Sequence, residues 1–332
     1  PFTAMNVFLL ALQFFAGFIL LVGGAEMLVR GASRLAVRFH LPPVLIGLTI
    51  VAFGTSLPEL VVSLTAAVNG AASEIAIGNI VGSNIANLGL ILGLAGIIKM
   101  LPVAASFTRN ELPVLLLVSL AFLGLAWLEN DISRWEGGLL VAGFVFVTAR
   151  SWRAAAHEPP YSEEVRTTVE TVEAIDPATA RPSRALWLDL LGIAVGLGGL
   201  VLGAQWLVDA ATALARALGV SELVIGLTLV AFGTSLPEVA TSVVAVLRGD
   251  TAIAVGNVVG SNLFNLLAIA GITALVRPLA VPQGMAPDFG VMILLTALVW
   301  FFAWWPKKAI ERWEAAILLG VYIVYIIQLV QR

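Results

Sequence analysis

The chain has 332 residues, of which 60% are hydrophobic and 12% are charged, and its mean hydropathy is +1.00. Soluble domains carry about 25% charged residues, so this composition excludes a soluble globular protein, a disordered chain and a secreted disulfide scaffold. A net charge of −3 and the lack of cysteine exclude a basic nucleic-acid-binding surface and cysteine-based chemistry. A polytopic helical membrane protein in a lipid bilayer remains.

Ten hydrophobic stretches are long enough to be transmembrane helices, each of which needs about 20 apolar residues. The first follows Met5, which we interpret as the native start, and no signal-peptide cleavage site follows that stretch. The fifth stretch is the weakest, because it is short and rich in glycine. We predict spans over residues 7–29, 43–68, 75–101, 112–128, 135–150, 186–214, 223–247, 253–276, 289–305 and 313–330.

The distribution of positive charge predicts the orientation of these spans. If both termini lie outside, the cytoplasmic segments hold most of the 18 Lys and Arg residues, as the positive-inside rule requires. The only long polar segment, residues 151–185, then becomes a cytoplasmic linker. It joins two five-span halves, residues 5–150 and residues 186–330.

The two halves contain an internal repeat. Sixteen of 25 positions are identical between Ile46–Gly70 and Ile225–Gly249, and nine of 13 between Ile75–Asn87 and Ile253–Asn265. We place the two repeats at residues 46–97 and 225–275. Equivalent elements are five spans apart, an odd number, so the second copy enters the membrane from the opposite side. Such an inverted repeat predicts a binding site at the midplane, between the copies.

Each repeat contains the motif GTSLPE in the middle of a hydrophobic span, ending at Glu59 in the first copy and Glu238 in the second. Proline lacks an N–H and clashes with the preceding turn, so each helix should break there. The break is expected to free backbone carbonyls around Ala52–Ser56 and Ala231–Ser235. Bare carbonyls at membrane depth line cavities or are buried in protein, and hard cations are suitable partners for them.

Glu59 and Glu238 are the only acidic residues near the centre of any predicted span. No Lys, Arg or His lies near the centre of a predicted span to pair with them. An unpaired carboxylate at the midplane is costly. The missing positive charge must therefore be a bound cation or a proton. Thr55 and Thr234 lie four residues before these glutamates, on the same helix face.

A second motif, GNxxGSN, produces a polar stripe in each repeat. Its members recur every four residues, and glycines beside them allow close approach of another helix. We predict that the stripe residues are ligands of the bound cations. A packing seam, with amides bonded between helices, is the alternative interpretation, and it applies more to Asn84 and Asn262, which lie off the stripe. The stripe residues are Asn79, Ser83 and Asn87 in the first repeat and Asn257, Ser261 and Asn265 in the second.

The other charged residues receive simpler interpretations. We expect Glu26 to form an interfacial ion pair with Arg30, four residues later. Four further acidic residues lie at span ends, where we expect them to be solvated: Asp209, Glu222, Asp250 and Asp288.

The two copies of GTSLPE paired with GNxxGSN resemble the repeats of the cation/calcium antiporter superfamily, in its prokaryotic sodium/calcium exchanger branch. The resemblance implies ten helices in two inverted halves around four ion sites, with the first and sixth helices sliding over a rigid core. It also implies that Glu59 and Glu238 bind both Ca²⁺ and Na⁺. Thr55 and Thr234 would contribute backbone carbonyls. Further oxygens for Na⁺ would come from Ser56, Ser235, Ser83, Ser261 and the carbonyls of Ala52 and Ala231.

Two departures refine this expectation. The GNAxE type of motif found in proton/calcium exchangers is absent, which favours Na⁺ over H⁺. Asn87 and Asn265 stand where some relatives have Asp, which argues against K⁺ dependence. We therefore expect an electrogenic Na⁺/Ca²⁺ exchanger of the plasma (inner) membrane, with three Na⁺ exchanged for one Ca²⁺ and protons as competitors.

The main alternative is an H⁺/Ca²⁺ antiporter on the same fold, and a passive cation channel is a further one. An intramembrane hydrolase is disfavoured, because no mid-membrane base accompanies Ser56 or Ser235. We expect no enzymatic activity, no cofactor and no obligate protein partner.

Overall fold

The computed structural model describes residues 4–68, 73–128, 130–156, 186–217, 231–304 and 308–331. Nearly all of these residues are helical. In the first half of the chain the elements are α1 (Ala4–Phe39), α2 (Pro43–Ile46), the π-helical turn η1 (Gly47–Val51), α3 (Ala52–Thr55), α4 (Leu57–Val68), α5 (Ser73–Ile85), the π-helical turn η2 (Ala86–Ile91), α6 (Leu92–Ile98), β1 (Leu101–Pro102), α7 (Ala105–Leu128), β2 (Asp131–Ile132) and α8 (Arg134–Ala156).

The second half repeats this order. Its elements are α10 (Leu186–Ala217), α12 (Ala231–Thr234), α13 (Leu236–Arg248), α14 (Thr251–Leu263), the π-helical turn η4 (Phe264–Ile269), α15 (Ala270–Val276), β3 (Leu279–Ala280), α16 (Ala286–Trp304), β4 (Ala309–Ile310) and α17 (Arg312–Gln331).

Seven helical stretches in the described part of the chain are long and apolar enough to cross a membrane, and an eighth is formed if the bent pair Pro43–Thr55 and Leu57–Val68 counts as one span. The chain is thus an all-α, multi-pass membrane protein. Helices also lie in the other predicted ranges, α8 over 135–150 and α12–α13 over 223–247. The start of the latter range, residues 223–230, is outside the described residues.

Several helices are longer than the membrane spans predicted from the sequence. Helix α1 continues to Phe39 instead of ending at residue 29, α7 begins at Ala105 instead of residue 112, and α8 extends to Ala156, into the first residues of the predicted linker. The reason is that hydropathy marks the hydrocarbon layer, whereas helical backbone hydrogen bonds continue through the polar residues at its surface. The rest of the linker is outside the described residues.

The breaks predicted at the GTSLPE motifs are confirmed. Ser56 separates α3 from α4 with ψ of 9°, and Ser235 separates α12 from α13 with ψ of 1°, both outside the helical range. The chain bends by 44° at Ser56. Each bend comes just before a proline, Pro58 or Pro237, which has no N–H to continue the helix.

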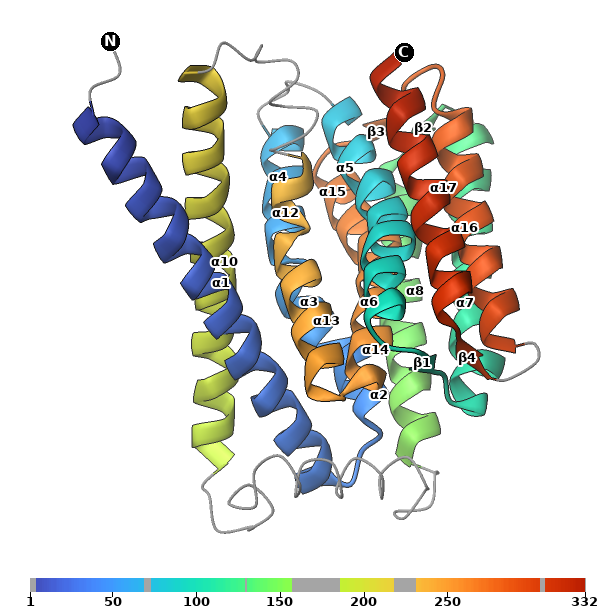
Figure 1. Ribbon diagram of the computed structural model, residues 1–332. Coiled ribbons are helices and arrows are strands. Elements are labelled where there is room, and N and C mark those ends of the chain that lie inside the picture. Colours follow the sequence, from blue (N-terminus) through green and yellow to red (C-terminus); the bar gives the residue numbers. More distant parts are fainter. Residues whose placement is uncertain are drawn as a thin grey trace.

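Helices α1 and α10 lie side by side at one edge of the molecule and run in opposite directions, whereas α7, α16 and α17 occupy the other edge and the broken helices lie between (Figure 1). The α1–α10 contact is very close: a Cβ atom on Gly24 would lie 2.6 Å from the carbonyl oxygen of Gly196, and one on Gly203 would lie 2.5 Å from the amide nitrogen of Leu21. Small residues permit this approach of the two backbones.

Two short antiparallel sheets connect the ends of the helices. Leu101 pairs with Ile310 in one sheet, and Leu279 pairs with Ile132 in the other. The two sheets are equivalent: β1 of the first half corresponds to β3 of the second, and β4 of the second half corresponds to β2 of the first. The helices that follow β2 and β4 also begin alike, because Glu136 accepts a hydrogen bond from the Ser133 amide, and Glu314 accepts one from the Glu311 amide.

The charged ends of the helices are tied into the structure. Glu26 forms the predicted ion pair with Arg30, at 2.8 Å, and also contacts Arg248 on α13. The expectation of solvated span-end carboxylates is confirmed for Asp209, which is exposed, but wrong for Asp288, which is buried and accepts a hydrogen bond from the Tyr325 hydroxyl at 2.9 Å.

Asp250 is also not a solvated carboxylate. It is partly buried between α13 and α14 and accepts a hydrogen bond from Ser33 of α1 at 3.0 Å. Burial raises the pKa of Asp250, and the Ser33 hydroxyl and the charges of Arg248 and Lys99 partly oppose that shift. These contacts with residues far away in the sequence could not be derived from the position of Asp250 at a span end. Glu222 lies outside the described residues.

Asp189 on α10 connects the two edge helices through ion pairs to Arg34 (3.2 Å) and Arg38 (3.5 Å) of α1. Asp189→Asn is expected to destabilise the protein by about 3 kcal/mol, because it removes the carboxylate that two mostly buried arginines share. The measurement is thermal unfolding of the purified protein in detergent. Asp209→Asn, at an exposed position on the same helix, is the matched control, and equal melting temperatures for the two variants would contradict the prediction.

Candidate ion-binding site

The two glutamates of the repeats lie at the starts of α4 and α13, directly after the breaks. Glu59 and Glu238 are 2% and 1% exposed, although both are carboxylates within apolar segments. They occupy the first turn of their helices, where unpaired backbone N–H groups and the helix dipole favour a negative charge. The motif GTSLPE therefore both interrupts the helix and places a carboxylate at the new N-terminus.

The two repeats are bonded to one another through these carboxylates. The Ser56 hydroxyl donates a hydrogen bond to Oε1 of Glu238 at 2.8 Å, and the Ser235 hydroxyl donates one to Oε1 of Glu59 at 3.4 Å. Each serine comes three residues before the glutamate of its own repeat. The reciprocal bonds thus bring both carboxylates into one buried site.

The second oxygen of each carboxylate is buried and has no hydrogen-bond partner, and neither glutamate forms an ion pair within the described part of the chain. Buried polar atoms are normally satisfied, so each exception requires an explanation. Two uncompensated carboxylates in one site need positive charge from outside the protein.

Further unpartnered oxygens come from the GNxxGSN helices. On the stripe they are the Ser261 hydroxyl and the side-chain oxygens of Asn87 and Asn265, and off the stripe the side-chain oxygen of Asn84, all of them buried. Ser83 is buried as well, on α5. The sequence stripe predicts a polar face in an apolar segment that includes Ser83, Ser261, Asn87 and Asn265. It did not indicate that Asn87 and Asn265 lie in the π-helical turns η2 and η4, a conformation frequent at functional sites.

Asn79 and Asn257, which the sequence predicts as ion ligands, form hydrogen bonds within the protein in this structure. Their amide nitrogens donate to Ser63 and Ser242, each at 3.0 Å. Asn257 also accepts a hydrogen bond from the Thr55 hydroxyl at 3.1 Å. These amides therefore hold the broken helices against α5 and α14.

The expectation of a bare carbonyl at Ala52 is wrong for this structure. Its oxygen accepts hydrogen bonds from the Ser56 amide at 3.1 Å and the Thr55 hydroxyl at 3.4 Å. The reason is that the helix continues to Ser56 before it turns. Pro58 lacks an N–H, so the carbonyl that loses its regular helical donor is that of Gly54, two residues later.

The second repeat is described less completely at this point. The backbone of Ala231 begins α12, but its side chain is outside the described residues. Thr234 is partly buried and has interactions of its own within the protein.

The donor set is suited to hard cations. Within the described residues, no group of three or more His, Cys, Asp and Glu side chains lies together in the manner of a zinc or di-metal cluster. The two carboxylates are instead bonded to serine hydroxyls, and the turns that carry Asn87 and Asn265 pack against the helices of the two glutamates. Oxygen atoms of this kind are the ligands that Ca²⁺ takes in proteins.

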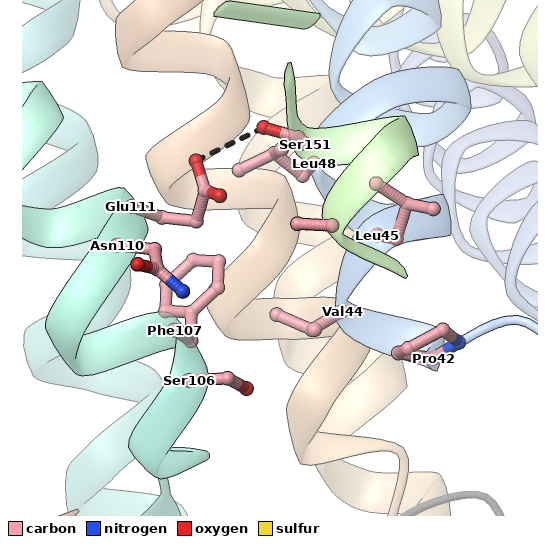
Figure 2. A pocket seen from close by; sticks show the side chains of 10 residues that line it. Pro42, Val44, Leu45, Leu48, Ser106, Phe107, Asn110, Glu111 and Ser151 are labelled. Atoms are coloured by element: carbon pink, nitrogen blue, oxygen red, sulfur yellow. Dashed lines mark hydrogen bonds between the residues drawn. The ribbon is translucent and has the colours of Figure 1, made fainter. Parts of the chain in front are cut away.

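A separate cavity of about 50 Å³ lies between the ends of α2, α7 and α8 (Figure 2). Glu111 points into it and accepts hydrogen bonds from Ser151 at 3.0 Å and Arg150 at 3.2 Å. Glu111 is therefore a buried glutamate whose charge is compensated within the protein, in contrast to Glu59 and Glu238.

Comparisons with known proteins agree with this geometry. The family described as sodium/calcium exchanger protein matches residues 9–153 and 188–331. A putative antiporter, CaxA, of Alkalimonas amylolytica is 37% identical over 313 residues, covering 93% of this chain and 95% of the relative. The sodium/calcium exchanger MaX1 of Methanosarcina acetivorans is 31% identical over 341 residues, covering 94% and 96%.

A solved structure of the sodium-calcium exchanger NCX_Mj, soaked with 10 mM Na⁺ and zero Ca²⁺, superposes with a TM-score of 0.82 at 32% identity, covering 96% of this chain and 98% of that one. The fold and these relatives define a multi-pass membrane transporter of the cation/Ca²⁺ antiporter class. The chain belongs to the sodium/calcium exchanger branch of the cation/calcium antiporter superfamily.

Proposed function

We propose that this protein exchanges Na⁺ for Ca²⁺ across the plasma (inner) membrane by alternating access. The observation that carries the proposal is the pair Glu59 and Glu238, two buried carboxylates that share a site and have one free oxygen each. Their combined charge of −2 equals the charge of one Ca²⁺. The relatives MaX1 and NCX_Mj are sodium/calcium exchangers, which supports Na⁺ as the exchanged ion.

The charge of the site also supports an electrogenic, K⁺-independent stoichiometry. One Ca²⁺ neutralises the two carboxylates, whereas three Na⁺ leave one positive charge, so each cycle would move one net charge. Asn at positions 87 and 265 keeps further negative charge out of the site. We assign the ion ligands to Glu59, Glu238, Thr55, Thr234, Ser56, Ser235, Ser83, Ser261, Asn87, Asn265 and Ala231. A supporting role is assigned to Ala52, whose carbonyl is already bonded within the protein, and to Asn79 and Asn257.

For the architecture we propose ten transmembrane helices in two inverted five-helix halves. The exchanged strand pairs, Leu101 with Ile310 and Leu279 with Ile132, support a twofold relation between the halves. The opposite directions of α1 and α10 support the inversion (Figure 1). Both termini would then lie outside and the linker 151–185 in the cytoplasm, in accord with the positive-inside rule.

Radiolabelled Ca²⁺ uptake into proteoliposomes tests the proposed coupling. Vesicles loaded with Na⁺ are expected to accumulate Ca²⁺, whereas vesicles loaded with K⁺ or choline at equal pH are not, because only an outward Na⁺ gradient drives the exchange. Valinomycin with K⁺ sets the membrane potential, and an inside-positive potential should speed uptake, because one net positive charge leaves with Na⁺. Uptake driven by a pH gradient without Na⁺ would replace this proposal with the H⁺/Ca²⁺ antiporter.

A further inference from the structure

Asn262 is outside the predicted set of ion ligands, yet its side chain joins the two repeats at two points. Its Oδ1 accepts a hydrogen bond from Nδ2 of Asn87 at 3.0 Å, and its own Nδ2 donates to the backbone carbonyl of Asn84 at 3.4 Å. Asn262 is 1% exposed. A buried amide on α14 therefore holds the junction of α5 and η2, where Asn87 lies.

The first of these bonds determines which atom Asn87 presents to the site. A side-chain amide carries an oxygen on one branch and an NH₂ group on the other. Because the NH₂ group of Asn87 is turned toward Asn262, its oxygen points the other way, where it is buried and has no partner. The turn η2 packs against α13, the helix that carries Glu238. The orientation of Asn87 thus leaves an acceptor oxygen available for a cation at that site.

The twofold-related residues lack this arrangement. Asn84, the counterpart of Asn262, donates its Nδ2 to the carbonyl of Ile80 in its own helix at 2.6 Å, and its Oδ1 is buried without a partner, so its side chain forms no hydrogen bond to the described residues of the other repeat. Asn265, the counterpart of Asn87, has no partner at either side-chain polar atom. The two equivalent amides therefore differ. Asn87 is oriented by Asn262, whereas no described residue orients Asn265.

We propose that Asn262 is a positioning residue for ion exchange: it holds the Asn87 amide so that the oxygen, and not the NH₂ group, faces the bound cation. The inference rests on the proposed function and adds a residue to it. Without Asn262, the Asn87 amide can rotate and present a donor to a cation. Ca²⁺ binding should therefore weaken when Asn262 is truncated. Truncation of Asn84, which is equally buried, should change Ca²⁺ binding little.

The experiment compares Asn262→Ala with Asn84→Ala in the full-length protein. The readouts are the Ca²⁺ concentration that half-saturates uptake, per folded protein, and the Kd of Ca²⁺ measured by calorimetry. We expect Asn262→Ala to raise both about tenfold, corresponding to the loss of one well-placed ligand bond, and Asn84→Ala to change them less than about twofold. Equal effects of the two truncations would overturn the assignment.

A second background separates positioning from simple packing. In Asn87→Asp, both branches of the side chain end in oxygen, so its orientation no longer matters. Adding Asn262→Ala to Asn87→Asp is expected to cost no further Ca²⁺ affinity, whereas a packing defect would cost the same about tenfold in both backgrounds, since independent effects add. The same loss in both would overturn the proposal.

Two precautions keep the result decisive. If Asn262→Ala does not give monodisperse protein, Asn262→Ser provides the same comparison, because a serine side chain is too short to reach Asn87. The outcome is also distinct from that of the proposed function. Half-saturating Ca²⁺ can be measured whichever ion drives uptake, so Na⁺-independent transport would refute Na⁺ coupling while still testing Asn262.

Discussion

Glu59→Gln and Glu238→Gln are each expected to abolish Ca²⁺ exchange. Either substitution leaves a single negative charge in a buried site, and one carboxylate cannot neutralise Ca²⁺. Glutamine also replaces an acceptor oxygen with an NH₂ donor, in a site where Ser56 and Ser235 already supply hydroxyl donors. Loss of one member of a buried charge pair costs about 3–5 kcal/mol, so uptake per folded protein should fall at least about 100-fold.

The measurement is Na⁺-driven uptake of radiolabelled Ca²⁺ in proteoliposomes with equal amounts of folded protein. Glu111→Gln is the matched control, since Glu111 is also a buried glutamate, but Arg150 and Ser151 compensate it. We expect that variant to retain exchange per folded protein. Full activity of Glu59→Gln would remove Glu59 from the site, and the same outcome for Glu238→Gln would remove Glu238.

Gly260→Ala is expected to destabilise the protein by at least about 3 kcal/mol, the upper range for overpacked cores. A Cβ atom at this position would lie 2.2 Å from the backbone oxygen of Leu48, and one on Gly256 would lie 2.3 Å from the backbone oxygen of Val44. Backbone atoms cannot rotate away, so α14 would have to move from α2 and η1. Ser261 and Asn262 would move with it, so ion binding should weaken as well.

Thermal unfolding and size-exclusion profiles in detergent measure this effect. The control is Gly124→Ala on α7, where an added Cβ meets no neighbouring atom within 4 Å and alanine improves helix propensity. Equal melting temperatures for the two variants would show that α14 does not require its close contact with η1.

Much of this protein follows from its sequence alone. Composition, the duplicated GTSLPE and GNxxGSN motifs and the spacing of the apolar runs led to a multi-pass helical membrane protein of the sodium/calcium exchanger branch, a conclusion that the fold and the relatives confirm. The helix breaks at Ser56 and Ser235 were also predictable, because a proline acts on the backbone immediately before it. These features depend on the hydrophobicity and chemistry of residues that are close together in the sequence.

Tertiary structure alone decided which polar atoms meet. The bonds of Ser56 with Glu238 and of Asn87 with Asn262 join residues more than 170 positions apart, and no periodicity within one helix specifies them. The same holds for Asp288, which reads as a solvated helix end but is buried against Tyr325. The sequence places these groups on helix faces; only the packing of one helix on another decides whether an oxygen is bonded within the protein or left free for an ion.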